Sequence, residues 1–323
     1  MKKYIVLYGN KKPEDNLEIT NIFESTEEIH LGWTDFDYHY NTKIIQKHIQ
    51  EGIKQIIFSG LEVGWDKLIK EIKQKNPEIT IKVICNTQDS LLYYEYERQN
   101  FFRLLALAKE GIVDNIAFFR KGQYETYQNL GYPCSYLKEN YILEESKKIE
   151  IKKPNGRIDL GIYPLNYTWD KNIFNQLCIA KFIENCNLNY NNLEERMSDF
   201  LNTMEITNSP DKIEKVEEKE LIKKLSKNDV IVATSFTEYV HPIFFISMEL
   251  GIPCLIGNNS DFFGNHEELK KYVVTNAEDN AIINSEIVKN MIENKEKIQE
   301  LYKDWKEDYN QQAQKSIEEF INK

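Results

Sequence analysis

The sequence predicts an α/β protein of two doubly wound, Rossmann-like domains that face each other across a cleft. Short apolar runs of strand length alternate with amphipathic helical stretches almost from end to end, which is typical of parallel sheets covered by helices. The length of 323 residues exceeds what one core usually supports and favours two domains of roughly 150 residues each. A charged run poor in large apolar side chains separates two such alternations.

The first alternation predicts an N-terminal domain over residues 1–143. Its apolar runs, such as "KYIVLYG" and "KQIIFSG", have the length of buried strands, and helical periodicity lies between them. We expect strands at 3–9, 28–33, 54–60, 79–85, 114–119 and 134–138. We expect helices at 41–52, 64–75, 93–110 and 121–130.

The run "EESKKIEIKKPNGR" at 144–157 has the composition of an exposed interdomain linker, with Pro154 and Gly156. The second alternation then predicts a C-terminal domain over 158–294. We expect its strands at 157–163, 199–204, 229–234, 252–256 and 272–275. We expect its helices at 170–185, 217–226, 242–250 and 284–294.

The last segment, 295–323, predicts a long polar helix over 295–321. Apolar side chains recur in it every three or four residues and therefore share one face; they are Ile298, Leu301, Trp305 and Tyr309. We expect this face to pack on a domain surface.

Charge and composition exclude several classes of partner. Lysine and arginine total 41 against 52 acidic residues, a net charge of −11 that repels nucleic acid and anionic lipid heads. The five cysteines are scattered, as expected for reduced thiols in the cytoplasm. No apolar run approaches the ~20 residues of a membrane span, so membrane contact is expected to be peripheral at most. The sequence shows no glycine-rich phosphate loop, which disfavours NAD and ATP, and no cofactor is expected.

The stretch "TSFTEYVHPIFFISMELGIPCLIG" at 234–257 reads as strand end, loop, helix and next strand. Pro242 lies in the first helical turn, where its missing N–H costs nothing. Gly251 follows the expected helix and ends it. The "FTEYV" loop then lies at the carboxyl edge of a sheet, where ligands of open α/β sheets bind. Helix-start amides attract phosphate, while the Glu238 carboxylate accepts hydrogen bonds from hydroxyls. Sugar plus phosphate fits this pattern; a solvated loop residue or a helix cap is the other interpretation of Glu238.

This stretch resembles the donor-binding segment of retaining, metal-independent nucleotide-sugar glycosyltransferases of GT-B architecture, particularly bacterial surface-polysaccharide transferases. In that family one glutamate stands eight residues before a second, which stands five residues before a glycine-x-proline turn. Counting back from Gly251, these positions are Glu238 and Ile246. The resemblance implies that Glu238 contacts the donor sugar. The ribose contact of the second position is missing, and whether Glu249 replaces it stays open.

The resemblance continues through "GIPCLIGNNSDFF" at 251–263. It implies donor contacts from polar residues of the two loops, Thr237, Asn258, Asn259 and Ser260, for which ordinary turn residues are the alternative. It also implies that His241 lies near the reacting groups.

A second segment, "LGIYPLNYTWDKNIFNQLCIAK" at 160–181, resembles the opening strand, loop and helix of the same family's donor domain. There a lysine, usually with an arginine several residues before it, holds the leaving diphosphate. Lys171 matches the lysine, and residues 158–170 contain no arginine. A fixed cation stabilises a departing diphosphate without a metal. The resemblance also implies a donor contact for Asn172.

Polar and small residues follow two strands of the first domain, where this architecture receives its acceptor. The acceptor candidates in "IIFSGLEVGWDKLIK" and "KVICNTQDS" are Gly60, Trp65, Asn86, Thr87 and Gln88. Ordinary loop and packing residues are the alternative for each. In "WTDFDYHY", Asp35, Asp37 and His39 would share a face if extended and could then hold a divalent cation, but so acidic a chain contains such pairs by chance, and no metal site is expected.

These observations and the resemblance together predict a cytoplasmic glycosyltransferase that moves a sugar from a nucleotide-diphosphate sugar to an acceptor hydroxyl. The resemblance alone implies that the acceptor is a glycan or lipid-linked glycan and that the anomeric configuration is retained. The assigned catalytic residues are Glu238, Lys171 and His241. Two alternatives stay open. One is a nucleotide-sugar epimerase, with Glu238 and His241 as acid and base. The other is a non-catalytic homologue that binds a glycan or stabilises a partner. In that case Ile246 and the missing arginine would be signs that catalytic residues have been lost.

Overall fold

The computed structural model describes residues 4–9, 22–32, 34–138, 156–164, 168–191, 195–206, 208–211, 218–236, 242–259, 262–264 and 266–323. The chain divides into two compact units. The first unit contains Met1–Tyr141 and Asn310–Lys323, and the second contains Ile142–Tyr309. The C-terminal helix, which the sequence presents as a separate segment over 295–323, is thus shared between the units.

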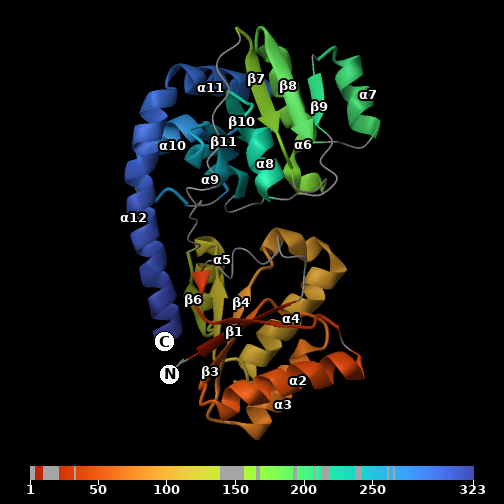
Figure 1. Cartoon of the computed structure of the whole chain (residues 1–323), viewed down its shortest axis with the longest axis vertical. Helices are drawn as coiled ribbons and strands as arrows, with labels where there is room; N and C mark the ends of the chain where they lie inside the picture. The colour runs from red at the N-terminus through yellow and green to blue at the C-terminus, as the bar shows by residue number, and fades with distance from the viewer. Residues whose placement is uncertain are drawn as a thin grey trace. The chain divides into compact units, whose positions relative to one another are not determined.

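The first unit is a parallel sheet covered by helices (Figure 1). Its strands are β1 (Tyr4–Gly9), β2 (Thr26–Ile29), β3 (Gln55–Ser59), β4 (Thr80–Cys85), β5 (Asn115–Phe118) and β6 (Cys134–Tyr136). Its helices are α2 (Asp35–Gln50), α3 (Trp65–Lys75), α4 (Glu95–Lys109) and α5 (Lys121–Asn129). The strands pair in the order β2-β1-β3-β4-β5-β6, and each pair is parallel.

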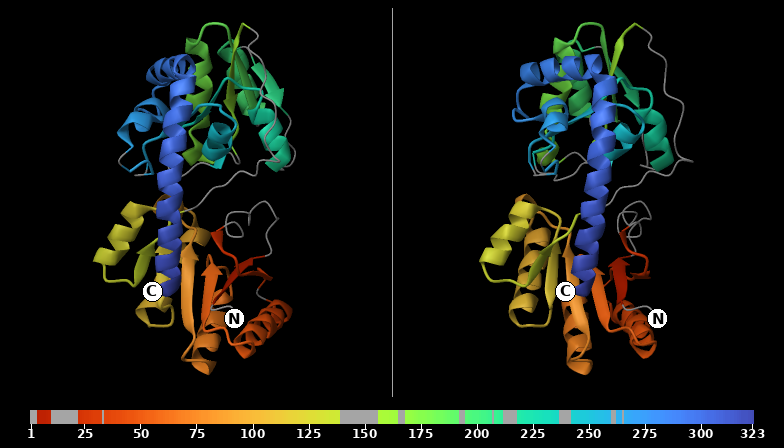
Figure 2. Two further views of the ribbon diagram at one scale, coloured as in Figure 1. Left: turned by 60° about the vertical axis from the view of Figure 1, so that its left-hand side comes forward. Right: turned by 90° about the vertical axis from the view of Figure 1, so that its left-hand side faces the viewer.

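Alternating side chains of this sheet build a core on each face, since successive residues of a strand point to opposite sides. On one face Phe58 packs with Leu68 of α3 and Leu104 of α4. On the other face Ile57 packs with Phe320, near the end of α12 (Lys295–Asn322). Figure 2 shows this end of the helix lying along the strands of the first unit. The sheet is therefore covered on both faces, as its continuous apolar strands require.

The second unit repeats the architecture. Its strands are β7 (Ile158–Ile162), β8 (Cys186–Asn191), β9 (Asn208–Asp211), β10 (Val230–Ala233), β11 (Cys254–Gly257) and β12 (Val274–Thr275). Its helices are α6 (Ile173–Ile179), α7 (Glu195–Thr203), α8 (Glu218–Leu225), α9 (Pro242–Glu249), α10 (Glu267–Val273), α11 (Ala281–Glu293) and the first part of α12. The predicted class, two parallel α/β sheets with helices, is confirmed.

The strand order of the second sheet, β12-β11-β10-β7-β8-β9, reverses between β7 and β10. From β7 the chain builds outward to β9, and it then returns to build from β10 to β12 on the other side. Helices that follow β7 and β10 diverge at such a point, so the carboxyl ends of these two strands frame the crevice where α/β sheets bind ligands.

An aromatic cluster packs the first part of α12 onto the second unit. The Trp305 ring lies 4.8 Å from Phe262 and 6.1 Å from Phe244, centroid to centroid. Trp305 is 1% exposed and Tyr309, stacked on it at 4.9 Å, is 5% exposed. The predicted apolar stripe of this helix therefore packs on the surface of the second unit.

The sequence-based elements of the second unit are wrong in four places. Helix α10 is not expected, and its last residues, Tyr272 and Val273, lie in the strand expected at 272–275, of which only Val274–Thr275 is a strand. The strand expected at 199–204 is instead helical up to Thr203, the last residue of α7. Strands β8 and β9 are not expected, because "CNLNYN" and "NSPD" are polar. The single helix expected at 170–185 is divided, because Asn172 takes the left-handed conformation with φ 54° and ends the short 3-10 helix Trp169–Lys171 before α6 begins.

Asp35, Asp37 and His39 do not form the extended segment on which a metal site would depend. They lie in the first turns of α2, where Asp37 and Thr34 form a capping box. The Asp37 backbone N–H donates to Thr34 Oγ1 at 3.2 Å, and the Thr34 hydroxyl donates back to Asp37 Oδ2 at 2.5 Å. These carboxylates therefore start a helix. No cluster of metal-ligating side chains occurs in the described part of the chain.

Candidate functional site

The candidate donor site lies at the reversal point of the second sheet. Tyr163 and Pro164 follow β7, Ser235 follows β10, and all three line a small cavity together with Lys171. Lys171 comes from the short helix Trp169–Lys171, which directly precedes α6. The lysine that the sequence singles out is thus placed at the carboxyl ends of the two strands that frame the crevice.

Lys171 is a buried cation. Only 7% of the residue is exposed, so it is not the solvated surface lysine that a helix start usually carries. Its Nζ lies 3.4 Å from Oδ2 of Asp170, which is 2% exposed. Its backbone carbonyl accepts a hydrogen bond of 2.7 Å from Gln176 Nε2. A buried ion pair of this kind is held in one place, which is what recognition of a phosphate requires.

Asn172 joins three loops of the sheet edge. Its Nδ2 donates to the backbone carbonyl of Thr234 at 3.0 Å, after β10, and to that of Glu278 at 2.6 Å, after β12. Its Oδ1 accepts from Asn175 Nδ2 at 2.6 Å. The amide is therefore engaged within the protein, and Asn172 acts on the site by positioning the loops around it.

The loop after β11 is fixed by two further bonds. The Asn258 backbone N–H donates to Glu278 Oε1 at 2.9 Å. Asn259 Nδ2 donates to the Ser235 carbonyl at 2.8 Å. Asn258 is exposed and Asn259 is half-buried, so the side chain of Asn258 is the one that faces solvent at this edge.

Four predicted donor or catalytic residues lie outside the described residues: Thr237, Glu238, His241 and Ser260. Their roles stay predictions. The elements that flank Glu238 and His241 are as expected, because β10 ends at Ala233 and α9 begins at Pro242.

The two candidates for the second glutamate position are both engaged within the protein. Ile246 is 4% exposed and belongs to the core. Glu249 Oε1 accepts a hydrogen bond of 2.7 Å from the Tyr302 hydroxyl and lies 2.5 Å from Lys306 Nζ, both on α12. Glu249 therefore anchors α12 to α9, and its substitution for the missing glutamate is not supported.

Three of the five acceptor candidates line one pocket of about 530 Å³ in the first unit. We call it the sheet-edge pocket, because Gly60 follows β3 and Asn86 and Thr87 follow β4. It is lined by Leu31, Gly60, Leu61, Glu62, Cys85, Asn86, Thr87, Leu91, Tyr96, Glu97, Asn100, Phe101 and Leu104.

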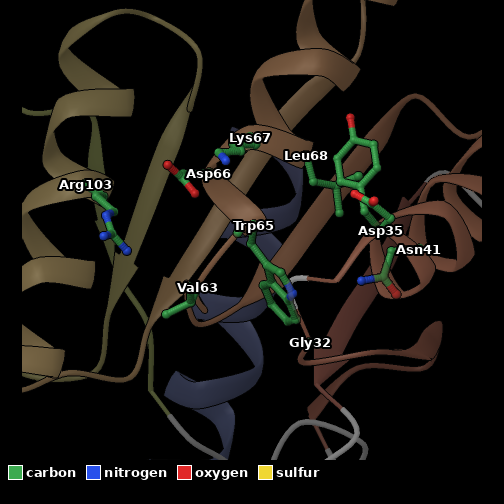
Figure 3. A pocket seen from close by; sticks show the side chains of 11 residues that line it. Gly32, Asp35, Asn41, Val63, Trp65, Asp66, Lys67, Leu68 and Arg103 are labelled. Atoms are coloured by element: carbon green, nitrogen blue, oxygen red, sulfur yellow. The ribbon is translucent and has the colours of Figure 1, made fainter.

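The other two acceptor candidates do not belong to this pocket. Trp65 lines a second pocket of about 420 Å³ (Figure 3), beside Asp66, Lys67 and Arg103. Its indole is 1% exposed and donates from Nε1 to the His30 carbonyl at 3.2 Å, so Trp65 is mainly a core residue. Gln88 precedes the short helix Asp89–Tyr93 and lines neither pocket.

Several polar residues of these sites are not among the predicted ones. In the second unit they are Asp170 and Glu278. In the sheet-edge pocket they are Glu62, Tyr96, Glu97 and Asn100. Position after a strand could have indicated Glu62, two residues beyond Gly60, and Asp170 stands directly before the predicted Lys171. The others lie on helix α4 or, for Glu278, on a loop about a hundred residues further along the chain than Lys171, where the spacing of residues carries no signal.

No protein-family model and no curated protein matches the chain, but several solved structures share its fold. Sucrose-phosphate synthase from Thermosynechococcus elongatus superimposes with a TM-score of 0.67 at 8% identity, over 99% of this chain and 95% of that one. HepE of Anabaena in complex with UDP-glucose gives 0.64 at 10% identity, over 98% of both chains.

The lipopolysaccharide outer core galactosyltransferase WaaB gives a TM-score of 0.60 at 11% identity, covering 94% of this chain and 98% of that one. The agreement extends over both units of the chain. The chain has the GT-B fold. Within the described residues, no helix combines the length and the apolar composition needed to cross a membrane.

Proposed function

We propose that the protein is a glycosyltransferase that uses a nucleotide-diphosphate sugar. The anomeric carbon of the donor forms a bond to an acceptor oxygen, and its bond to the diphosphate breaks. The acceptor hydroxyl loses its proton, and the nucleoside diphosphate leaves with the electron pair. The acceptor is a glycan or a lipid-linked glycan, and the anomeric configuration is retained.

The observation that carries this proposal is the buried cation at the reversal point of the second sheet. Negative charge grows on the bridging oxygen as the diphosphate leaves, and a cation fixed before the reaction stabilises that charge without reorganisation. Lys171 is buried against the ends of β7 and β10. This chemistry needs no metal ion. Similarity of fold to enzymes such as WaaB supports the same interpretation.

The remaining roles follow from the sequence. Glu238 accepts hydrogen bonds from the hydroxyls of the donor sugar, and His241 at the start of α9 lies near the reacting groups. The exposed Asn258 adds a donor contact, while Asn172 and Asn259 hold the loops in place. The sheet-edge pocket of the first unit receives the acceptor.

Incubation of the full chain with radiolabelled uridine and guanosine diphosphate sugars tests the proposal. We expect slow release of nucleoside diphosphate without acceptor, and Glu238→Gln should abolish it. Interconversion of the sugars without release would indicate an epimerase, and neither reaction would indicate a non-catalytic homologue. Once an acceptor is found, NMR of the anomeric proton in the product tests retention.

A further inference from the structure

Glu278 places a carboxylate at the donor edge of the second unit. It follows β12, and its backbone carbonyl accepts the 2.6 Å hydrogen bond from Nδ2 of Asn172, the residue after Lys171. Its side chain reaches the loop after β11, where Oε1 accepts from the Asn258 backbone N–H at 2.9 Å. Glu278 is half-buried, and Asn258 beside it is exposed. The carboxylate therefore lies at the surface of the sheet edge, where a ligand can reach it.

Gly257, the last residue of β11, makes room for this carboxylate. A Cβ at position 257 would lie 2.9 Å from Glu278 Cγ, 3.0 Å from Glu278 Oε1 and 2.9 Å from the Ser235 carbonyl oxygen. Any side chain at this position would displace the carboxylate or the loop after β10. Ser235 in turn lines the cavity that contains Lys171. The Glu278 carboxylate and one wall of the Lys171 cavity therefore both lie against the end of β11.

The carboxylate lies one strand beyond the reversal point of the sheet. Strand β11 is the neighbour of β10, and β10 is the neighbour of β7. Neighbouring strands are about 4.8 Å apart. The proposed function places the diphosphate of the donor at Lys171, against the ends of β7 and β10. The ribose is joined to that diphosphate through a single carbon atom, C5′, so its 2′ and 3′ hydroxyls can reach a group one strand spacing away.

The carboxylate has an oxygen to offer to such a hydroxyl. In the part of the chain that the structure describes, Oε1 of Glu278 accepts from Asn258, and Oε2 accepts no hydrogen bond. A carboxylate accepts stronger hydrogen bonds than a neutral oxygen does. Its negative charge repels the diphosphate itself, so this position suits the nucleoside part of the donor.

We propose that Glu278 binds a ribose hydroxyl of the nucleotide-sugar donor. The inference rests on the proposed function, which brings a nucleoside diphosphate to this edge of the sheet. It adds a residue that distinguishes ribonucleotides from nucleotides without ribose hydroxyls. The Asn258 N–H holds Oε1 in place before the ligand arrives and leaves Oε2 for the ligand, which lowers the entropy cost of binding.

Calorimetric titration of the full chain with UDP, GDP and their 2′,3′-dideoxy forms tests the inference without turnover. For the wild type, removal of the ribose hydroxyls should weaken binding about tenfold or more. Glu278→Gln should weaken binding of the ribonucleotide about tenfold, because a neutral acceptor replaces a charged one. In this variant the ribo and dideoxy forms should bind within about threefold of each other. Glutamine keeps an oxygen that accepts from the Asn258 N–H, so the loop after β11 stays in place.

Asp279→Asn is the matched control, because it removes the adjacent, exposed carboxylate and should leave every affinity unchanged. Glu278→Ala also removes the acceptor of the Asn258 N–H and should weaken binding of both the ribo and the dideoxy forms. Equal affinities of the two forms for the wild type would overturn the inference. An equal loss of both forms in Glu278→Gln would also overturn it, since Glu278 would then act only by holding the loop.

Release of nucleoside diphosphate from the nucleotide sugar is measured on the same samples. Release by the wild type, together with either of these overturning titrations, would defeat the role of Glu278 and leave the proposed function standing. Neither binding nor release with any of the nucleotides at millimolar concentration would defeat the proposed function, and the inference with it.

Discussion

The Asn172 side chain donates a hydrogen bond of 2.6 Å to the backbone carbonyl of Glu278, 106 residues further along the chain. A second bond from the same Nδ2 reaches the Thr234 carbonyl at 3.0 Å. One amide thus ties together the segments that follow β7, β10 and β12, and the Lys171 cation precedes it directly. A neutral side chain next to Lys171 therefore holds these three segments of the second unit together.

Replacement of Asn172 should destabilise the second unit. Asn172→Ala leaves buried carbonyls without donors and places at φ 54° an alanine, which tolerates the left-handed conformation less well than asparagine, so we expect a loss of about 2–4 kcal/mol in urea unfolding. Asn172→Gly removes only the hydrogen bonds and should lose less. Asn185 has φ 52° but is exposed, so Asn185→Ala should lose about 1 kcal/mol at most. Equal losses at 172 and 185 would mean that the hydrogen bonds contribute nothing.

Removal of the Lys171 charge should abolish catalysis. We expect Lys171→Met to lower nucleoside diphosphate release about 10²–10³-fold, the typical effect of losing one group that stabilises the departing charge. Lys181, which is 40% exposed and 3.9 Å from Glu205, is the matched control, and Lys181→Met should be fully active. Because Lys171→Met leaves the buried Asp170 carboxylate without this cation, stability is measured on the same samples. The double variant Asp170→Asn, Lys171→Met should recover stability but not activity. Recovered activity would show that catalysis does not need the Lys171 charge.

Much of the parallel fold could be predicted because most of its strands, such as β3 and β10, are largely apolar. Strand β8 could not be predicted, because it contains Asn187 and Asn189. Their amides are tolerated in a strand only because they form hydrogen bonds with residues distant in sequence. Asn187 Nδ2 donates to Asp159 Oδ1 at 2.8 Å, and Asn189 Nδ2 donates to Asn228 Oδ1 at 2.9 Å. Such a network satisfies buried amides, but local sequence does not reveal it.

The candidate site likewise contains residues that the sequence could indicate and residues that it could not. Lys171 could be found because it lies in a contiguous strand, loop and helix segment. Glu278 could not, since it approaches Asn172 and Asn258 only when β12 joins the sheet beyond β11. The count from Gly251 already places Ile246, which cannot accept a hydrogen bond, at the second-glutamate position. What the sequence could not show is that Glu249 is bonded to Tyr302 and Lys306 of α12.

Glu249→Gln separates a structural role from a role in donor binding. Glu249 is bonded to Tyr302 and Lys306 of α12, so we expect a loss of about 1–3 kcal/mol in unfolding free energy. The KM for the nucleotide sugar should not change. Glu296→Gln, at an exposed position of α12, should stay within about 0.5 kcal/mol. A higher KM for Glu249→Gln at unchanged stability would instead indicate that Glu249 contacts the ribose of the nucleotide sugar.

Gly257→Ala should disturb the donor edge by sterics alone. A Cβ at this position would lie 2.9 Å from the Ser235 carbonyl oxygen and 2.9 Å from Glu278 Cγ. Because the Ser235 carbonyl is backbone, the loops must move, and we expect a loss of about 1–3 kcal/mol together with weaker nucleotide-sugar binding. Gly122→Ala, in α5 with no atom within 4 Å, should instead stabilise the protein by about 0.5–1 kcal/mol. Calorimetric titration and urea unfolding of both variants measure these effects.

Lys82 should make the first unit more stable as pH rises through mildly alkaline values. It is 1% exposed on β4, and its Nζ donates to the carbonyls of Phe320 at 2.5 Å and Ile321 at 3.2 Å at the end of α12. Burial lowers the pKa of Lys82 from 10.5 to about 8, with Asp114 opposing the shift and Lys323 adding to it. Between these values the unfolded chain binds more protons than the folded one, so the free energy of unfolding rises with pH.

Lys82→Met removes this titration while other groups cancel in the comparison. We expect the stability of the wild type, relative to Lys82→Met, to be constant below about pH 7 and to increase from about pH 8 to 10. The neutral amine still donates to the helix-end carbonyls, so the packing of α12 persists in this range. Urea unfolding of both proteins at pH values about one unit apart, from about 6.5 to about 10, measures the difference in their free energies of unfolding. A constant difference would show that the buried amine keeps an ordinary pKa, and a difference that falls with pH would show that its pKa is raised; either result contradicts the prediction.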